Sequence, residues 1–181
     1  MPSTFEKTRK QIQKKRHGTI DALHQLSRDS RRLHKASVRD QRLNKLATAR
    51  EKREQPMLDR VAFFRERVNE LRASALTQEQ INELIQQFVS QYDDELATLK
   101  KARRPGRPPT TKEDLLKRKA EALASEHDTG FLIPDLSSED NVARLDRWEG
   151  SWAYLCTLAW VRVSKAGNIR PSVFPPSSGD H

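Results

Sequence analysis

Aromatic and basic residues are segregated along this chain, and their separation limits where a core can form. Of the 11 aromatic residues only Phe5 lies among the first 55 residues, which hold 16 Lys or Arg and 6 Asp or Glu. So polar a stretch cannot bury enough apolar surface to offset the conformational entropy lost on ordering. We therefore expect residues 1–55 to be a basic N-terminal arm and the core to form from residue 56 onward.

The net charge alternates in sign along the chain. Residues 1–55 carry +10, residues 56–99 carry −4, residues 100–119 carry +7 and residues 120–181 carry −4, which gives the overall +9. Two basic stretches separated by acidic, more apolar ones indicate an acidic partner. Lysines and arginines that neutralise phosphates release condensed counterions, so the pattern favours nucleic acid as that partner.

Composition and motifs exclude several classes of protein. A mean hydropathy of −0.87 and the lack of an apolar run of about 20 residues exclude a membrane-spanning helix. The single cysteine, Cys156, cannot form an internal disulfide and lies in an apolar run, where a buried, inert thiol is usual. The histidines are scattered and the glycines are not clustered. We therefore predict a soluble intracellular protein that is not an enzyme, with no metal, cofactor, membrane or small-molecule substrate.

The first half of the sequence predicts helices. Residues 20–54 lack Pro and Gly but show no sustained apolar stripe, which indicates a solvated helix or one held by a partner. Pro56 suits the first turn of a new helix, and apolar residues then recur at helical spacing to Leu71. These residues open a compact, hairpin-type helical module that we expect to span residues 56–130.

Two capping boxes begin further helices in this module. Thr77 with Gln80 precedes an apolar stripe that continues to Leu99, and Thr110 with Glu113 precedes a helix that we expect to reach about His127. Between these helices lies a basic Pro-Gly turn at residues 100–109, in which the prolines keep the backbone extended.

The last 51 residues are rich in aromatic side chains. Residues 157–163 predict one strand, for which the sequence offers no pairing partner, and the tail from Ser164 contains Gly and Pro and should be irregular. The fold class is therefore mainly α: a basic helical arm, the helical module, and an aromatic-rich, partly extended segment at residues 131–181 with at most one or two short strands.

Three basic clusters are candidates for RNA binding. The first also resembles a nuclear import signal, the second has a spacing that places most of it on one helix face, and the third surrounds the Pro-Gly turn. The first comprises Lys7, Arg9, Lys10, Lys14, Lys15 and Arg16; the second Arg28, Arg31, Arg32, Lys35, Arg39 and Arg42; the third Lys100, Lys101, Arg103, Arg104 and Arg107.

The third cluster has a competing interpretation. Residues 104–108, Arg-Pro-Gly-Arg-Pro, resemble the AT-hook, in which a Gly-Arg-Pro core enters the minor groove of A·T-rich DNA, although Pro105 stands where that motif has an arginine. The same residues also suit a rigid basic linker between two capped helices. A DNA-binding, chromatin-associated protein therefore remains the alternative function.

An ordered set of short segments resembles one known family. The segments are HQLSRDSRRL at 24–33, DRVAFF at 59–64, DDELATLK at 93–100, RRPGRPP at 103–109, GFLIPDL at 130–136, NV at 141–142, WEG at 148–150 and FPP at 174–176. In this order and spacing the chain resembles the translation machinery-associated protein 16 family, especially its fungal members, over about residues 20–176. The one departure is His24-Gln25, where family members often have Pro or Glu after the histidine.

The resemblance implies a non-catalytic assembly factor of the large ribosomal subunit. Such a factor would join nuclear pre-60S particles, in the nucleolus and nucleoplasm, and leave before translation. Its partners would be large-subunit ribosomal RNA, ribosomal proteins and other assembly factors. Candidates for the protein contacts are Phe131, Trp148, Trp152 and Trp160, with the alternative that at least two of the three tryptophans fill the core.

Overall fold

The computed structural model describes residues 4–16, 23–24, 26–104 and 106–175. They belong to two compact units, residues 1–55 and residues 56–181. The predicted, mainly helical class is confirmed. In chain order the elements are α1 (Phe5–Arg16), α2 (Arg28–Leu71), α3 (Gln78–Val89), η2 (Ser90–Tyr92), α4 (Asp93–Ala102), α5 (Thr111–Thr129), β1 (Phe131–Pro134), α6 (Glu139–Asp146), η3 (Ala153–Thr157), β2 (Trp160–Val163) and β3 (Ile169–Ser172).

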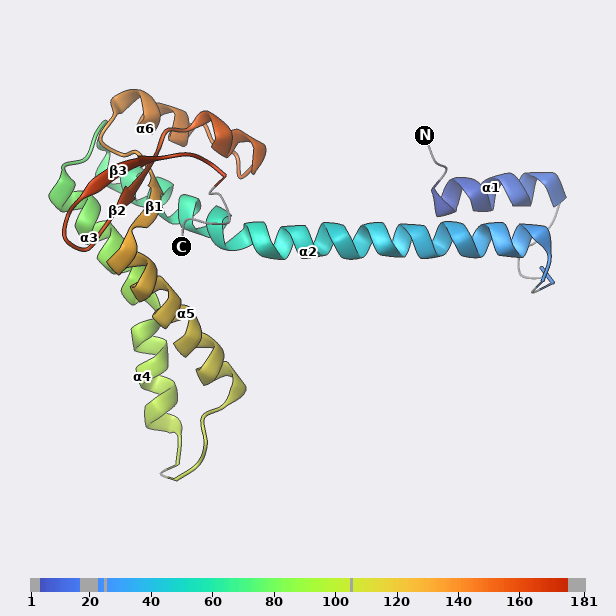
Figure 1. Cartoon of the computed structure of the whole chain (residues 1–181), viewed down its shortest axis with the longest axis horizontal. Coiled ribbons are helices and arrows are strands. Elements are labelled where there is room, and N and C mark those ends of the chain that lie inside the picture. The colour runs from blue at the N-terminus through green and yellow to red at the C-terminus, as the bar shows by residue number, and fades with distance from the viewer. Residues whose placement is uncertain (1–3, 17–22, 25, 105, 176–181) are drawn as a thin grey trace. The chain divides into compact units, whose positions relative to one another are not determined.

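In the N-terminal unit, α1 lies antiparallel against the first part of α2 (Figure 1). Thr8 and Ile12 are 1% exposed and meet a buried Ala36, which is a very small apolar contact. The carboxylate of Asp40 accepts a 2.6 Å hydrogen bond from the Phe5 N–H at the start of α1, where a helix leaves such donors unsatisfied. Polar contacts thus compensate for the shortage of apolar residues in this unit.

Pro56 lies inside α2, so the predicted helix start at this residue is wrong. A proline within a helix removes one hydrogen bond to the carbonyl four residues earlier, here that of Lys52. Because Lys52 and its neighbours are exposed, water can hydrate that carbonyl. Tertiary packing of the following residues, Val61, Phe64 and Val68, then continues the helix into the second unit.

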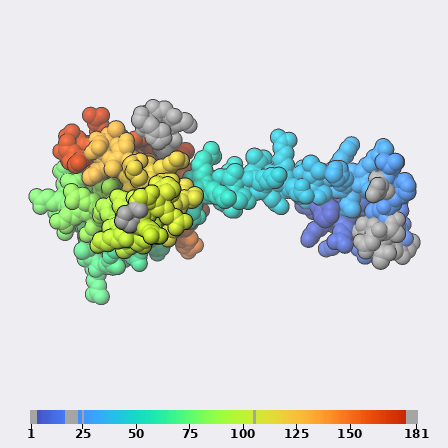
Figure 2. Space-filling model, turned by 90° about the horizontal axis from the view of Figure 1, so that it is seen from below, coloured from blue at the N-terminus to red at the C-terminus, as the bar shows by residue number. Residues whose placement is uncertain are grey.

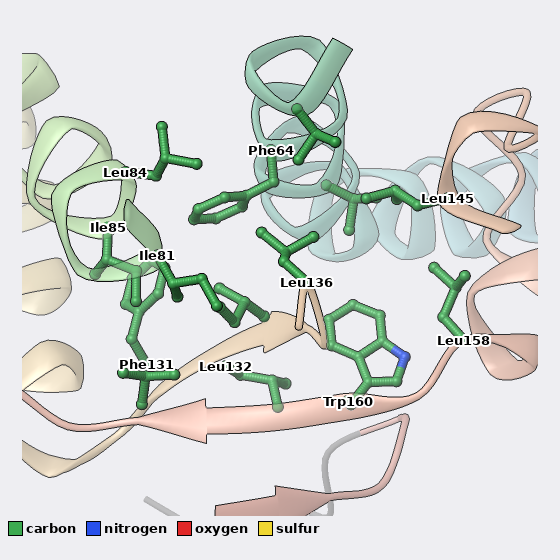
Figure 3. Packing of buried hydrophobic residues seen from close by; sticks show 14 of the residues in the cluster. Phe64, Ile81, Leu84, Ile85, Phe131, Leu132, Leu136, Leu145, Leu158 and Trp160 are labelled. Atoms are coloured by element: carbon green, nitrogen blue, oxygen red, sulfur yellow. The ribbon is translucent and has the colours of Figure 1, made fainter. Parts of the chain in front are cut away.

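Side chains of the C-terminal unit form one hydrophobic core between α2, α3, α6 and the sheet (Figure 3). Phe64, Phe131 and Ile133 are fully buried there. The core contains residues from both sides of the expected boundary at residue 130, so 56–130 and 131–181 belong to one unit. Gly130 marks the end of α5 rather than a linker: its φ of 144° favours glycine, and its N–H bonds the carbonyl of Glu126.

The helix predicted from Thr77 to Leu99 is interrupted. The capping box of Thr77 and Gln80 is confirmed, but α3 ends at Val89 and the single turn η2 separates it from α4. The hydroxyl of Ser90 donates to the Gln86 carbonyl over 2.8 Å, a local bond that competes with the helical pattern. On both sides of this turn the chain contacts α5, through α3 as well as through α4.

The C-terminal segment contains three strands, one more than expected. β2 pairs antiparallel with β1 on one side and with β3 on the other, so the partners absent from the sequence-based interpretation lie in this chain. The tail expected to be irregular contributes β3 and the buried Phe174, whose ring stacks on Trp160 at 4.7 Å between centroids. β1 and β2 pair at long range, while β3, which joins β2 in a local hairpin, contains Pro171 and is largely exposed, so its sequence lacks the usual pattern of a strand.

Candidate RNA-binding surface

The predicted cations of α1 divide between solvent and α2. Lys7, Lys10 and Lys14 line one shallow hollow on the side of α1 that faces away from the buried Thr8 and Ile12. The side chains of Arg9 and Lys15 are also exposed. By contrast, the Arg16 guanidinium pairs with Asp29 at 3.0 Å. Five of the six predicted residues therefore remain available to an external anion.

The second predicted cluster forms a stripe along α2. With 3.6 residues per turn, five of its six members, all but Arg32, lie within about 80° of arc, roughly a quarter turn from the buried Ala36. Two adjoining shallow grooves run along this stripe and share His34 and Lys35. The second groove is also lined by Val38. We call these residues the α2 basic stripe: Arg28, Arg31, Lys35, Arg39 and Arg42.

Two carboxylates of α2, those of Asp29 and Asp40, bond groups of α1. The side chain of Asp29 is 13% exposed, and that of Asp40 is 28% exposed and pairs with Arg39 at 3.3 Å. The guanidinium of Arg32 donates a 2.9 Å hydrogen bond to the side-chain oxygen of Gln11 in α1. These two carboxylates are thus engaged within the hairpin, whereas Glu6 lines the same outer hollow as the lysines of α1 and Glu51 is exposed.

The third predicted cluster lies at the loop between α4 and α5, at the end of this helical pair away from the sheet (Figure 1). Figure 2 views the C-terminal unit from the side of this loop. Lys100, Lys101, Arg104 and Arg107 are exposed, and the Arg107 N–H donates to the Arg104 carbonyl over 3.1 Å, next to Gly106 with a φ of 82°. The segment is therefore a turn; Pro105 lies outside the described residues.

Arg103 differs from the other members of the third cluster. Its guanidinium pairs at 3.5 Å with Glu113, whose side chain is 6% exposed. Thr110 caps α5 as predicted, accepting from the Glu113 N–H over 3.2 Å, but no reciprocal bond from the Glu113 side chain completes the box. Arg103 therefore holds α4 and α5 together, a role it shares with the 2.6 Å pair of Lys112 and Glu95.

Several cations that the candidate clusters omit lie on α5. Lys117, Arg118 and Lys119 are exposed on this helix, and Lys117 pairs with Glu121 at 3.7 Å. They belong to the stretch at residues 100–119 that carries +7, so the net charge of this stretch already indicated them as candidates. Only the pairing of α4 with α5 shows that they share one hairpin with the turn.

The aromatic candidates for protein contacts are largely core residues. Phe131 is 0% exposed and Trp148 and Trp160 are each 3% exposed, whereas Trp152 is half-buried. The indole N–H groups of Trp148 and Trp160 donate to backbone carbonyls of the chain at 2.9 Å. Because these side chains are already packed and hydrogen-bonded, the alternative that at least two tryptophans fill the core describes the structure.

Cys156 is exposed, so the expectation that its thiol is buried is wrong. Among the described residues, no group of three or more His, Cys, Asp or Glu side chains is arranged to hold a metal ion. Within the same part of the chain, no helix is both long enough and apolar enough to cross a membrane.

Comparison with known proteins identifies the family. The sequence matches the family described as "Translation machinery-associated protein 16" over residues 19–165. It is also 31% identical over 172 residues to a Saccharomyces cerevisiae protein of that name, an alignment covering 92% of this chain and 96% of the relative. The resemblance inferred from the ordered segments is thereby confirmed, and the chain belongs to the translation machinery-associated protein 16 family.

Proposed function

We propose that this chain is a non-catalytic assembly factor that binds nuclear pre-60S particles through large-subunit ribosomal RNA and neighbouring ribosomal and assembly proteins. Family membership supports an association with the translation machinery. The charge distribution supports RNA as the direct ligand within that machinery. In this proposal the protein acts in the nucleolus and nucleoplasm and is released before translation begins.

The observation that carries the proposal is the polarity of the α1–α2 hairpin. The carboxylates of Asp29 and Asp40 bond groups of α1 at the helix–helix contact, while Lys7, Lys10 and Lys14 of α1 and four of the five residues of the α2 basic stripe are exposed. A surface arranged this way attracts a polyanion through many phosphate contacts and needs no deep pocket. The exposed cations at the α4–α5 turn provide a second, separate contact of the same kind.

Sedimentation of cell extracts tests the place of the protein in the cell. We expect the tagged chain to migrate with pre-60S particles from nuclear extract and to be absent from polysomes, since an assembly factor leaves before translation. A stable presence on translating polysomes would instead identify a constituent of mature ribosomes. Purification of particles on the tag, followed by sequencing of their RNA, identifies whether they contain precursor large-subunit RNA.

Competition binding distinguishes RNA from the A·T-rich DNA of the AT-hook interpretation. We expect structured ribosomal RNA to compete better than an A·T-rich duplex, and Arg107→Ala to weaken RNA binding by less than about 10-fold, because it removes one phosphate contact among many. The folded turn at Gly106 favours this outcome. A preference for the A·T-rich duplex that Arg107→Ala abolishes would establish the DNA-binding alternative.

A further inference from the structure

A cleft of about 440 Å³ lies on the C-terminal unit between α2, the η2 region and α5. Its size falls in the range of about 300–1,000 Å³ typical of ligand sites. Phe63 of α2, Phe88 of α3 and Tyr92 of η2 line it, and the rings of Phe63 and Phe88 contact each other at 5.1 Å between centroids. Neither the family description nor the proposed function assigns a role to this cleft.

The lining of the cleft is mixed rather than apolar. Six of its eleven residues are polar or charged, among them Gln91, whose amide can both donate and accept hydrogen bonds. Arg60 and Glu126 form part of the wall, where two bonds of 2.7 and 2.6 Å neutralise their charges. The ammonium group of Lys119 lies 5.7 Å from the centre of the Tyr92 ring and supplies a positive charge beside the cleft.

We propose that this cleft binds an unpaired nucleobase of RNA; the inference rests on the proposed function and names a site for it. Proteins recognise single-stranded RNA by stacking exposed bases on aromatic side chains and bonding their polar edges. Phe63 and Tyr92 provide the aromatic surfaces, and Gln91 provides an amide for a base edge. Lys119 is placed to meet the adjoining phosphate.

The position of the cleft on α5 supports a nucleotide rather than a protein side chain. Lys119 lines the cleft and is exposed, and α5, which begins just after the basic turn, also carries the exposed Arg118. An RNA strand that follows those cations passes the cleft within the length of one helix. An apolar anchor from a protein would fill the aromatic part but would offer no hydrogen bond to Gln91 or to the Tyr92 hydroxyl.

The test uses the full-length chain and a short single-stranded RNA that carries one 2-aminopurine, with the matching duplex as second probe. We expect stacking to quench the fluorescent base on binding. Tyr92→Leu should lower affinity for the single strand about 5- to 100-fold, the range for loss of one stacked base, and leave affinity for the duplex unchanged. Tyr154→Leu is the matched control, because Tyr154 is also half-buried but lies outside the cleft.

The outcomes separate the two proposals. If the wild type binds neither probe, the proposed function fails. If it binds both and Tyr92→Leu behaves like Tyr154→Leu, or binding occurs without quenching, the base site alone is overturned and the cleft is left for a protein partner. If the Tyr92→Leu variant does not fold, Gln91→Ala is the alternative test, because the Gln91 side chain is exposed. Removing its amide should reduce the preference of the protein for one base over another. No change in that preference overturns the site.

Discussion

Neutralising the α2 basic stripe should weaken RNA binding about 10²- to 10³-fold at about 0.1 M salt, because each lost phosphate contact removes counterion release. The variant replaces by glutamine the four fully exposed members of the stripe: Arg28, Arg31, Lys35 and Arg42. Arg39 stays, since it pairs with Asp40. The plot of log K against log salt should become less steep by about 3, from a loss of about 0.7 per contact on a single strand. Filter binding or fluorescence anisotropy at several salt concentrations measures both quantities.

A variant with the same change in net charge tests whether position matters. It replaces four exposed cations of the C-terminal unit, away from the proposed contacts: Arg72, Arg147, Lys165 and Arg170. We expect this control to reduce affinity far less and to leave the salt slope nearly unchanged. Equal slopes for the two variants would show that only overall charge acts, and an unchanged slope in the stripe variant would remove the stripe from the RNA contact.

Replacing Arg60 by leucine should destabilise the C-terminal unit by about 1–3 kcal/mol, the cost of leaving the buried Leu132 carbonyl without its hydrogen-bond donor. The Arg60 side chain is 9% exposed, its guanidinium pairs with Glu126 at 2.6 Å, and it also donates to the Leu132 carbonyl over 3.0 Å. It lies 4.0 Å from the centre of the Phe131 ring. Urea denaturation followed by tryptophan fluorescence should report the loss, since the three tryptophans belong to this unit.

The physical reason lies at the free edge of β1. β1 pairs with β2 on one side only, and on the other side the N–H and C=O of Leu132 bond Glu126 and Arg60. The ion pair thus satisfies backbone groups that burial would otherwise leave unpaired. Arg67→Leu is the control, because its pair with Glu70 is exposed and should contribute less than about 1 kcal/mol. A similar loss in both variants would contradict a special role for Arg60.

A double variant tests whether the pair or the missing partner causes the loss. Arg60→Met with Glu126→Leu removes both charges together, and replacing a buried ion pair by apolar residues is often nearly neutral. We therefore expect it to recover part of the stability lost in Arg60→Leu. The Leu132 backbone groups remain unpaired in the double variant, so we expect that recovery to be incomplete.

How far the sequence predicts this protein depends on the range of the interactions involved. The capping box at Thr77 needs only residues within one helical turn, and it forms as expected. Pro56 has the local signal of a helix start, yet packing of the next turns on the core keeps α2 continuous through it. The three strands have only four residues each, and the pairing of β1 with β2 joins residues about 30 positions apart, whereas β2 and β3 form a local hairpin.

The same distinction applies to the candidate site. Spacing alone places the α2 basic stripe on one face, because helix periodicity is a local property. Whether a given cation is available is a tertiary property: Arg16 and Arg103 are paired with carboxylates that lie far from them along the chain or across a loop. The aromatic residues of the C-terminal segment likewise could not be assigned to surface or core until the sheet and its covering helices were in place.

The sequence by itself therefore determined the helical class, the family and the partition of charge into two basic stretches, since each follows from composition and order. Tertiary structure decided which cations face solvent, where the strands find partners, and how Arg60 and Glu126 close the edge of β1. Those features require groups distant in sequence to meet in a buried environment, where unpaired charges and backbone groups are costly.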